Sequence, residues 1–245
     1  MNPRIALLVL TGLLVAARLH AQGDTRDDVA LFQAFFHDTP TTAELVGEAG
    51  VTFGDAEEGD SFVVGARGRY PLDERLEAGA GLSFVSIGSD LGPDESSISD
   101  LWLSARYRLP TGKVPASAGG YVTVPIGEEA AGQGRLDLGG FGALRYPLPS
   151  GLVITGTAGL DLVELPGLDD REASLLLGGG VIYPHTERLS LVGELLLESQ
   201  KDYMVLSGGA DLRLAGSGRL RGWLGLGLDD GAPDVQLAGS YLMTW

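Results

Sequence analysis

The last eleven residues of the chain, from Val235 to Trp245, read VQLAGSYLMTW. Every second residue of this stretch is apolar, aromatic or glycine, namely Val235, Leu237, Gly239, Tyr241, Met243 and Trp245. Successive side chains of an extended chain point to opposite sides, so these six residues share one face. The stretch therefore predicts a β-strand with one apolar face.

The same alternation recurs upstream of Val235. Counting the last stretch, twelve segments of roughly 10 to 14 residues show it, and they span 43–54, 61–70, 75–88, 97–109, 116–127, 134–146, 151–163, 172–183, 188–198, 203–214, 219–229 and 234–245. Ordinary strands have about five or six residues, whereas a tilted strand that crosses a bilayer needs about 9–11. A soluble sandwich also alternates, but the length of these segments favours strands that cross a membrane.

The connections between the segments are of two kinds that alternate along the chain. Connections of the first kind are short, and each begins with a tyrosine followed closely by a proline. They lie at Tyr70-Pro71, Tyr107 to Pro110, Tyr146-Pro147 and Tyr183-Pro184. Proline ends strands, and tyrosines at strand ends are typical of an interfacial aromatic girdle. The other kind is acidic, as at Asp55 to Asp60. We therefore expect an all-β fold, a transmembrane antiparallel up-and-down β-barrel of about 12 strands over residues 42–245, with periplasmic tyrosine-proline turns and outward acidic loops.

The composition excludes several classes of protein. The 33 Asp and Glu residues outnumber the 17 Lys and Arg residues, so the formal net charge is −16. This charge argues against a nucleic-acid partner, because phosphate contacts need clustered Lys and Arg. The chain has no Cys, which excludes a disulfide scaffold, a thiolate metal site and a lipid-modified cysteine. We expect neither a metal nor a cofactor.

The first 21 residues have the features of a secretory signal peptide. Arg4 supplies the positive charge, and an almost unbroken apolar run of thirteen residues follows from Ile5 to Ala17. Thirteen helical residues span only about 20 Å, which is short of the ~30 Å hydrocarbon core of a bilayer. Residues 1–21 are therefore expected to be cleaved after Ala21, and the mature chain is expected in the cell outer membrane.

Residues 22–41 differ from the strands that follow them. Their apolar residues recur at helical spacing after an aspartate that can cap a helix, and they are Val29, Leu31, Phe32, Phe35 and Phe36. The spacing predicts a short helix that ends before Pro40. A helix this apolar needs a partner surface. Three placements stay open: it plugs the barrel, it lies at the barrel mouth, or it binds another molecule.

The end of the last segment resembles the C-terminal signal of outer-membrane barrels. In that signal a terminal aromatic residue is preceded at alternate positions by apolar residues, and Tyr241, Met243 and Trp245 match it here. The resemblance implies recognition by the barrel-assembly machinery.

The middle of the chain resembles the outer-membrane family named for the MetA pathway of phenol degradation, a group of transporters. The similar stretches are Ser99 to Leu109 (SDLWLSARYRL), Gly120 to Gly127 (GYVTVPIG) and Gly134 to Gly142 (GRLDLGGFG), within about residues 40–165. The family has no catalytic residues to carry over. The resemblance therefore implies a barrel and a transport role, without naming phenol as the solute.

Alternation places nine arginines on the face that looks into the barrel, all within about five residues of a short turn. They are Arg67, Arg69, Arg106, Arg108, Arg145, Arg188, Arg213, Arg219 and Arg221. Two interpretations stay open. The arginines form ion pairs that fill the barrel with carboxylates of the same region, Glu44, Glu48, Glu77 and Asp211, or they line a water-filled conduit with a basic inner mouth and an acidic outer one.

Enzymatic activity is not expected. Barrel phospholipases and proteases need a histidine near the outer rim as a general base. The three histidines are His20 in the signal peptide, His37 in the N-terminal segment and His185 in a short turn. We therefore expect passive or weakly selective passage of small solutes, anionic or hydrophobic. The first alternative is a non-conducting structural or surface-interaction barrel, and the second is an outer-membrane hydrolase. Expected partners are outer-membrane lipid and lipopolysaccharide, and we expect a monomer.

Overall fold

The computed structural model describes residues 29–39, 44–56, 59–88, 94–112, 114–129, 134–164 and 171–245. The expected signal peptide, residues 1–21, and residues 22–28 lie outside these ranges. Within the described ranges, no helix is both long enough and apolar enough to cross a membrane.

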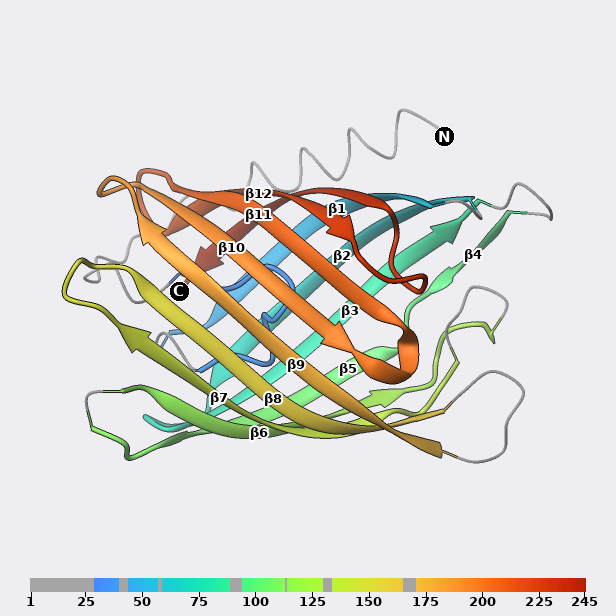
Figure 1. Ribbon diagram of the computed structural model, residues 1–245, viewed down its shortest axis with the longest axis horizontal. Helices are drawn as coiled ribbons and strands as arrows, with labels where there is room; N and C mark the ends of the chain where they lie inside the picture. Colours follow the sequence, from blue (N-terminus) through green and yellow to red (C-terminus); the bar gives the residue numbers. More distant parts are fainter. Residues whose placement is uncertain are drawn as a thin grey trace.

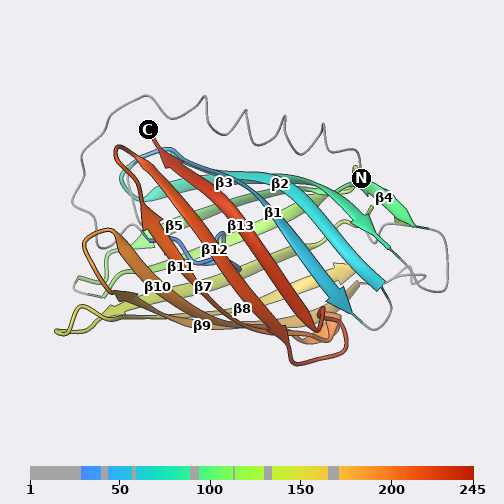
Figure 2. The same cartoon turned by 90° about the horizontal axis from the view of Figure 1, so that it is seen from above.

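The described strands form one antiparallel sheet that closes into a barrel (Figures 1 and 2). Its strands are β1 (Val46–Ala56), β2 (Gly59–Pro71), β3 (Leu76–Ile87), β4 (Glu95–Ile98), β5 (Leu101–Leu109), β6 (Ala116–Val124), β7 (Leu138–Pro147), β8 (Val153–Glu164), β9 (Arg171–Pro184), β10 (Leu189–Glu198), β11 (Tyr203–Arg213), β12 (Gly218–Gly227) and β13 (Val235–Thr244). A single turn of 3-10 helix, η2 (Ser199–Lys201), lies between β10 and β11.

The first and last strands close the ring. Val46 of β1 lies opposite Thr244 of β13, and the pairing continues to Asp55 opposite Val235. Closure leaves no free edge along these two strands, as a transmembrane sheet requires, because unpaired backbone groups in lipid are costly.

The fourth predicted segment, 97–109, is interrupted at Ser99-Asp100 and appears as β4 and β5, which both pair with β3. Counting these two as one position in the wall gives the twelve-stranded antiparallel barrel that the sequence predicts, and that prediction is confirmed. The interruption coincides with a contact between segments that are distant in the sequence. The Asp100 carboxylate accepts hydrogen bonds from the backbone N–H groups of Gly127, Gly134 and Arg135 at 2.9–3.0 Å, so it anchors the connection between β6 and β7.

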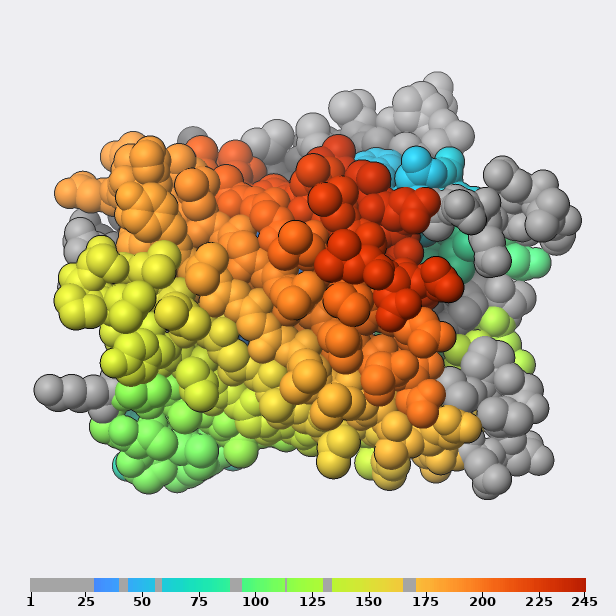
Figure 3. All heavy atoms as spheres, in the orientation of Figure 1, coloured from blue at the N-terminus to red at the C-terminus, as the bar shows by residue number. Residues whose placement is uncertain are grey.

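The two faces of the wall differ as the alternation predicts. Exposed large apolar residues, such as Leu160, Leu195 and Leu224, lie on the outside. Figure 3 shows the outer face formed by the later strands of the wall. Four exposed tyrosines, Tyr70, Tyr107, Tyr146 and Tyr183, lie at the ends of β2, β5, β7 and β9 that lead into the short turns. We call this rim the turn end and the opposite rim the loop end.

The predicted N-terminal helix is wrong for the residues that the structure describes. Residues 29–39 form a series of bends that lies inside the barrel (Figure 2). Their one backbone–backbone hydrogen bond in the described part of the chain joins His37 N–H to the Ala34 carbonyl at 3.1 Å. The reason is that barrel side chains, rather than other main-chain groups, bond to the amides and carbonyls of this segment.

Candidate functional site

Residues 29–39, which we call the inner segment, fill the half of the barrel nearest the turn end. Most of its residues are buried, and Phe35 and Thr39 are 0 % exposed. Val29, Leu31, Phe32 and Ala34 pack against Val153, Ile182 and Val192 of β8, β9 and β10. Ala30 and Phe35 pack against Val46 and Leu242, close to the seam between β1 and β13. Part of the barrel lumen is therefore filled by a segment of the same chain.

A carboxylate in the middle of β10 accepts hydrogen bonds from backbone N–H groups of the inner segment. Glu194 accepts hydrogen bonds from three consecutive backbone N–H groups, those of Phe32, Gln33 at 2.9 Å and Ala34 at 3.4 Å. Consecutive N–H groups that converge on one anion form a concave nest. Glu194 is buried, and these bonds satisfy its charge in place of water.

Arginines of the barrel wall donate hydrogen bonds to the backbone carbonyls of the inner segment. Arg67 donates to the Phe32 carbonyl at 2.8 Å and Arg145 to the Val29 carbonyl at 2.8 Å. Arg221 donates to the carbonyl of Ala30, and Arg106 to those of Asp38 and Phe35. Since the wall offers donors and acceptors on several strands, the segment is stabilised without forming a helix or a strand.

Three side chains of the inner segment serve as anchors. The ring of Phe35 lies between the guanidinium groups of Arg67 and Arg69, 4.1 and 4.4 Å from its centre. The ring of Phe32 lies 4.5 Å from the Arg221 guanidinium. The Asp38 carboxylate pairs with Arg145, whose Nε lies 3.0 and 3.1 Å from the two carboxylate oxygens. Cation–π contacts and bidentate pairs of this kind are strong when they are shielded from water.

Glycines of the wall make room for the aromatic rings. A Cβ atom on Gly79 of β3 would lie 2.9 Å from the ring of Phe36, and one on Gly209 of β11 would lie 2.8 Å from the ring of Phe32. Phe36 then stacks on Trp102, whose ring centre lies 3.9 Å from that of Tyr121. The absence of side chains at these glycines lets the segment lie close to the wall.

The structure places six of the nine predicted arginines in the inner half of the lumen, among carboxylates. Arg67 and Arg221 pair with Glu48 at 2.8 and 2.6 Å, Arg219 and Arg221 pair with Asp211 at 2.6 and 3.1 Å, and Arg106 pairs with Glu77 at 2.6 Å. Arg69 is buried beside Phe35, and Arg145 pairs with Asp38. Arg108 and Arg188 are exposed, and Arg213 is partly exposed. With the segment in place, the ion-pair interpretation describes these side chains.

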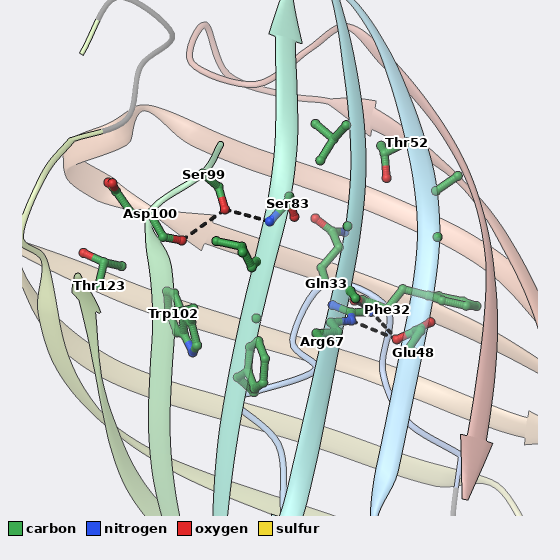
Figure 4. Close-up of a pocket in the computed structure, with 18 of the residues that line it drawn as sticks. Phe32, Gln33, Glu48, Thr52, Arg67, Ser83, Ser99, Asp100, Trp102 and Thr123 are labelled. Carbon is green, nitrogen blue, oxygen red and sulfur yellow. Dashed lines mark hydrogen bonds and ion pairs between the residues drawn. The ribbon is translucent and has the colours of Figure 1, made fainter. Parts of the chain in front are cut away.

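A cavity of about 630 Å³ occupies the half of the barrel nearest the loop end. Phe32, Gln33, Phe36 and His37 form its floor, and its wall includes Trp102, Asp100, Asp137 and Glu198. Figure 4 shows Arg67 and Glu48 meeting between adjacent strands, with Phe32 and Gln33 beside them. The inner segment therefore separates this cavity from the turn end.

His37 lies in an aromatic box at the floor of the cavity. Its ring is roughly perpendicular to those of Trp102, Tyr121 and Phe141, with ring centres 5.1 to 5.6 Å away. Neither ring nitrogen has a hydrogen-bond partner among the described residues. Burial lowers the pKa of His37 to about 4, so the imidazole is neutral at pH 7.

The residues of the C-terminal signal lie on β13 and just after it. A Cβ atom on Gly218 would lie 2.2 Å from the Tyr241 hydroxyl oxygen, and one on Gly47 would lie 2.9 Å from the Trp245 ring, so both rings cover glycines of neighbouring strands. Met243 lies opposite Gly47 of β1 and Gly218 of β12. The described residues contain no cluster of His, Asp and Glu suited to a metal ion.

Alternation places Glu194 on the lumen face, but sequence reasoning did not predict that Glu194 and Asp38 hold the inner segment. The available signal for Glu194 was a carboxylate at the centre of an otherwise apolar segment, facing the lumen, where a buried charge needs a partner. Asp38 gave no such signal, because it lies outside the strands and its partner Arg145 is 107 residues away.

No family model matches the chain, and no curated protein sequence matches it. Solved structures do match. An outer membrane channel from Pseudomonas putida F1 is similar with a TM-score of 0.68 and 17 % identity, over 88 % of this chain and 100 % of that one. The KdgM porin is similar with a TM-score of 0.59 and 8 % identity, over 82 % and 99 %, and its complex with disordered oligogalacturonate gives 0.57 and 7 % over the same shares. The chain therefore has the fold of outer-membrane channels.

Proposed function

We propose that the protein is an outer-membrane channel for small solutes and that the inner segment closes its periplasmic half. One observation carries this proposal: a closed wall encloses a cavity of about 630 Å³ that stops at residues 32–37. A barrel whose only task were structural would not need such a space. The non-conducting barrel remains the second candidate, and the filled inner half favours it.

The charge of the inner half supports small anionic solutes. Six arginines, Arg67, Arg69, Arg106, Arg145, Arg219 and Arg221, face four carboxylates, those of Glu48, Glu77, Glu194 and Asp211. Without the inner segment, which supplies Asp38 and several carbonyls, these arginines outnumber the buried carboxylates that they face. A basic constriction attracts anions. The KdgM porin has been solved with an oligogalacturonate, and acidic saccharides are one class of solute to test here.

The test is the conductance of planar bilayers that contain the refolded mature chain, compared with a variant that lacks residues 29–39. We expect low or intermittent conductance from the full chain. The deletion should give steady, larger conductance with a reversal potential that indicates anion preference. Heat-modifiable migration on a gel reports that each form is a folded barrel. If both folded forms conduct nothing, the channel proposal is wrong and the structural barrel replaces it.

A full-length variant in which the inner segment is cross-linked to the wall serves as the control for a permanently closed channel. Gln33 Nε2 lies 2.7 Å from Ser207 Oγ of β11, and the chain has no native Cys. Gln33→Cys with Ser207→Cys, joined by a short bifunctional thiol reagent, fixes the segment in the lumen. We expect this form to lose the openings that the unjoined double variant shows.

The proposal also covers the partners of the channel, its oligomeric state and its family. Exposed acids at the loop end, such as Asp55, Asp60, Glu128 and Asp230, support contact with lipopolysaccharide through divalent ions. Tyr241, Met243 and Trp245 support delivery by the barrel-assembly machinery, and the long strand pairing between β1 and β13 supports a monomer. Membership of the MetA-pathway family belongs here too, and the similarity to the P. putida channel supports it.

A further inference from the structure

The inner segment is bound by the barrel, and the barrel wall is complete without it. Each strand pairs with neighbouring strands around a closed ring, and within the described residues the inner segment belongs to none of these pairings. Side chains of the wall donate to and accept from its main chain, and they also pack against its side chains. The relation is that of a receptor and a ligand joined by a short stretch of chain, residues 40–43.

The contacts with the main chain define a site that recognises the main chain of a bent peptide. Glu194 accepts three consecutive amides, while Arg67, Arg145, Arg221 and Arg106 donate to carbonyls at both ends of the segment. Any residue except proline presents these amides, so this part of the recognition depends little on side chains.

The side-chain contacts add specificity at a regular spacing. Phe32 contacts Arg221, Phe35 lies between Arg67 and Arg69, and Asp38 pairs with Arg145. These three anchors are three residues apart in sequence, so the site selects the pattern Phe-x-x-Phe-x-x-Asp. A few buried aromatic and charged anchors usually carry most of the binding energy of an interface.

The wall keeps its own ion pairs when the segment leaves. The pairs Arg106–Glu77, Arg219–Asp211 and Arg67–Glu48 lie within the wall, and water in the emptied lumen can solvate the other groups. Release therefore exposes charged groups to water instead of leaving them buried and unpaired, which is the costly alternative.

From these contacts we propose that the inner half of the lumen is a peptide-binding site and that residues 29–39 are its exchangeable resident ligand. A separate peptide with the Phe-x-x-Phe-x-x-Asp pattern, presented at the turn end, occupies the same site when the segment leaves. This inference concerns binding and holds whether or not the barrel conducts.

The experiment uses the full mature chain with Ala34→Cys, which gives the protein one cysteine at a buried position. A water-soluble thiol reagent labels this cysteine only when the segment has left the lumen. We add the synthetic peptide VALFQAFFHDT, residues 29–39, to the refolded protein in detergent micelles. By mass action the labelling rate rises by the factor 1 + [peptide]/Kd, so peptide at ten times its Kd raises it about eleven-fold.

Two internal checks sharpen the result. Only four residues, 40–43, join the native segment to residue 44, and so short a connection gives it an effective concentration in the millimolar range. The peptide Kd should therefore equal roughly that concentration multiplied by the open fraction without peptide. A peptide with Phe32→Ala, Phe35→Ala and Asp38→Asn changes should have little effect at the same concentration. Ser150→Cys, at an exposed turn position, controls for reagent reactivity and should label equally with and without peptide.

Two outcomes would overturn the proposal. If Ala34→Cys stays unlabelled for hours at any peptide concentration while Ser150→Cys reacts, the segment is an integral part of the fold. If the changed peptide accelerates labelling as much as the native one, the site does not recognise the pattern. Because the readout is labelling, these failures are distinct from an absence of conductance, which would count against the channel alone.

Discussion

The Asp38 carboxylate has both oxygens within 3.1 Å of the Arg145 Nε, in a part of the lumen closed to solvent. Asp38→Asn leaves a buried guanidinium without its counter-charge, and breaking a buried pair in this way costs about 3–5 kcal/mol. On the Ala34→Cys background we expect at least ~100-fold faster thiol labelling, because each 1.4 kcal/mol is about tenfold in an equilibrium. Asp230→Asn, at an exposed loop position, is the matched control and should leave the rate unchanged.

His37 makes closure dependent on pH. Its pKa is about 4 in the lumen, against about 6.5 in water once the segment is released. Between these values the released state binds more protons, so acid favours release: closure is strongest above pH 6.5 and weakens as the pH falls to 4. The total change is about 3 kcal/mol.

Several groups face His37 and share this environment. Arg106 and Trp102 approach from β5, Tyr121 from β6, Phe141 from β7, and Glu198 and Lys201 from β10 and η2. Less of the thiol is in the reactive thiolate form in acid, so the labelling rate of Ala34→Cys is divided by that of Ser150→Cys at the same pH. This ratio should rise between pH 6.5 and pH 4.5. His37→Phe keeps the aromatic packing and should flatten this part of the profile. An unchanged profile in His37→Phe would assign the pH dependence to other groups.

At the scale of elements, β3 shows how a strand with glycines opposite an aromatic ring receives the inner segment. A Cβ atom on Gly79 would lie 2.5 Å from Ser104 Oγ and 2.9 Å from the Phe36 ring, and both of these neighbours are side chains that can move. Gly79→Ala should therefore displace Phe36 while the barrel still folds. Overpacking of this kind costs typically 1–3 kcal/mol, which corresponds to roughly 5- to 150-fold faster labelling of Ala34→Cys.

Gly156→Ala in β8 is the control for this prediction, because a Cβ atom there meets nothing within 4 Å. It should leave the labelling rate and the heat-modifiable migration unchanged. Equal effects of the two alanines would mean that the β-sheet itself, rather than contact with Phe36, responds to the change.

The sequence predicts most elements of the barrel because the period of a strand is local information. In β10, for example, Leu191 and Leu195 face outward while Glu194 faces inward, as alternation requires. The break between β4 and β5 could not be predicted in this way. It depends on Asp100 accepting amides from residues 127–135, and that contact exists only in the folded chain.

The inner segment shows the same limit more clearly. Val29, Phe32 and Phe36 have the spacing of an amphipathic helix, yet a short helix is only marginally stable by itself. The barrel offers Glu194 and several arginines as better partners for its amides and carbonyls. Alternation placed nine arginines on the lumen face, and six of them lie in its inner half near the expected carboxylates Glu48, Glu77 and Asp211. It did not predict their contacts with the inner segment.

At the scale of the whole molecule, the two rims differ in kind. The turn end has tyrosines and short turns that mix both signs of charge, as at Asp73 and Arg75 or Glu187 and Arg188. The loop end has the longest connection, residues 125–137 between β6 and β7, and an excess of carboxylates. Transfer of ionised carboxylates through hydrocarbon is costly, so the turn end enters a preformed bilayer more easily than the loop end does.

Because of that asymmetry, the protein should insert into synthetic membranes in one preferred orientation. We therefore expect barrels added to finished liposomes to insert turn end first and to point their loop ends toward the surrounding buffer. A membrane-impermeant reagent or an acid jump applied outside then reaches the cavity directly, whereas a peptide that must approach from the turn end has to be trapped inside the vesicle beforehand. In such liposomes, reagents outside the vesicle act on the loop end and reagents trapped inside act on the turn end. The two ends of the barrel can therefore be tested separately in one preparation.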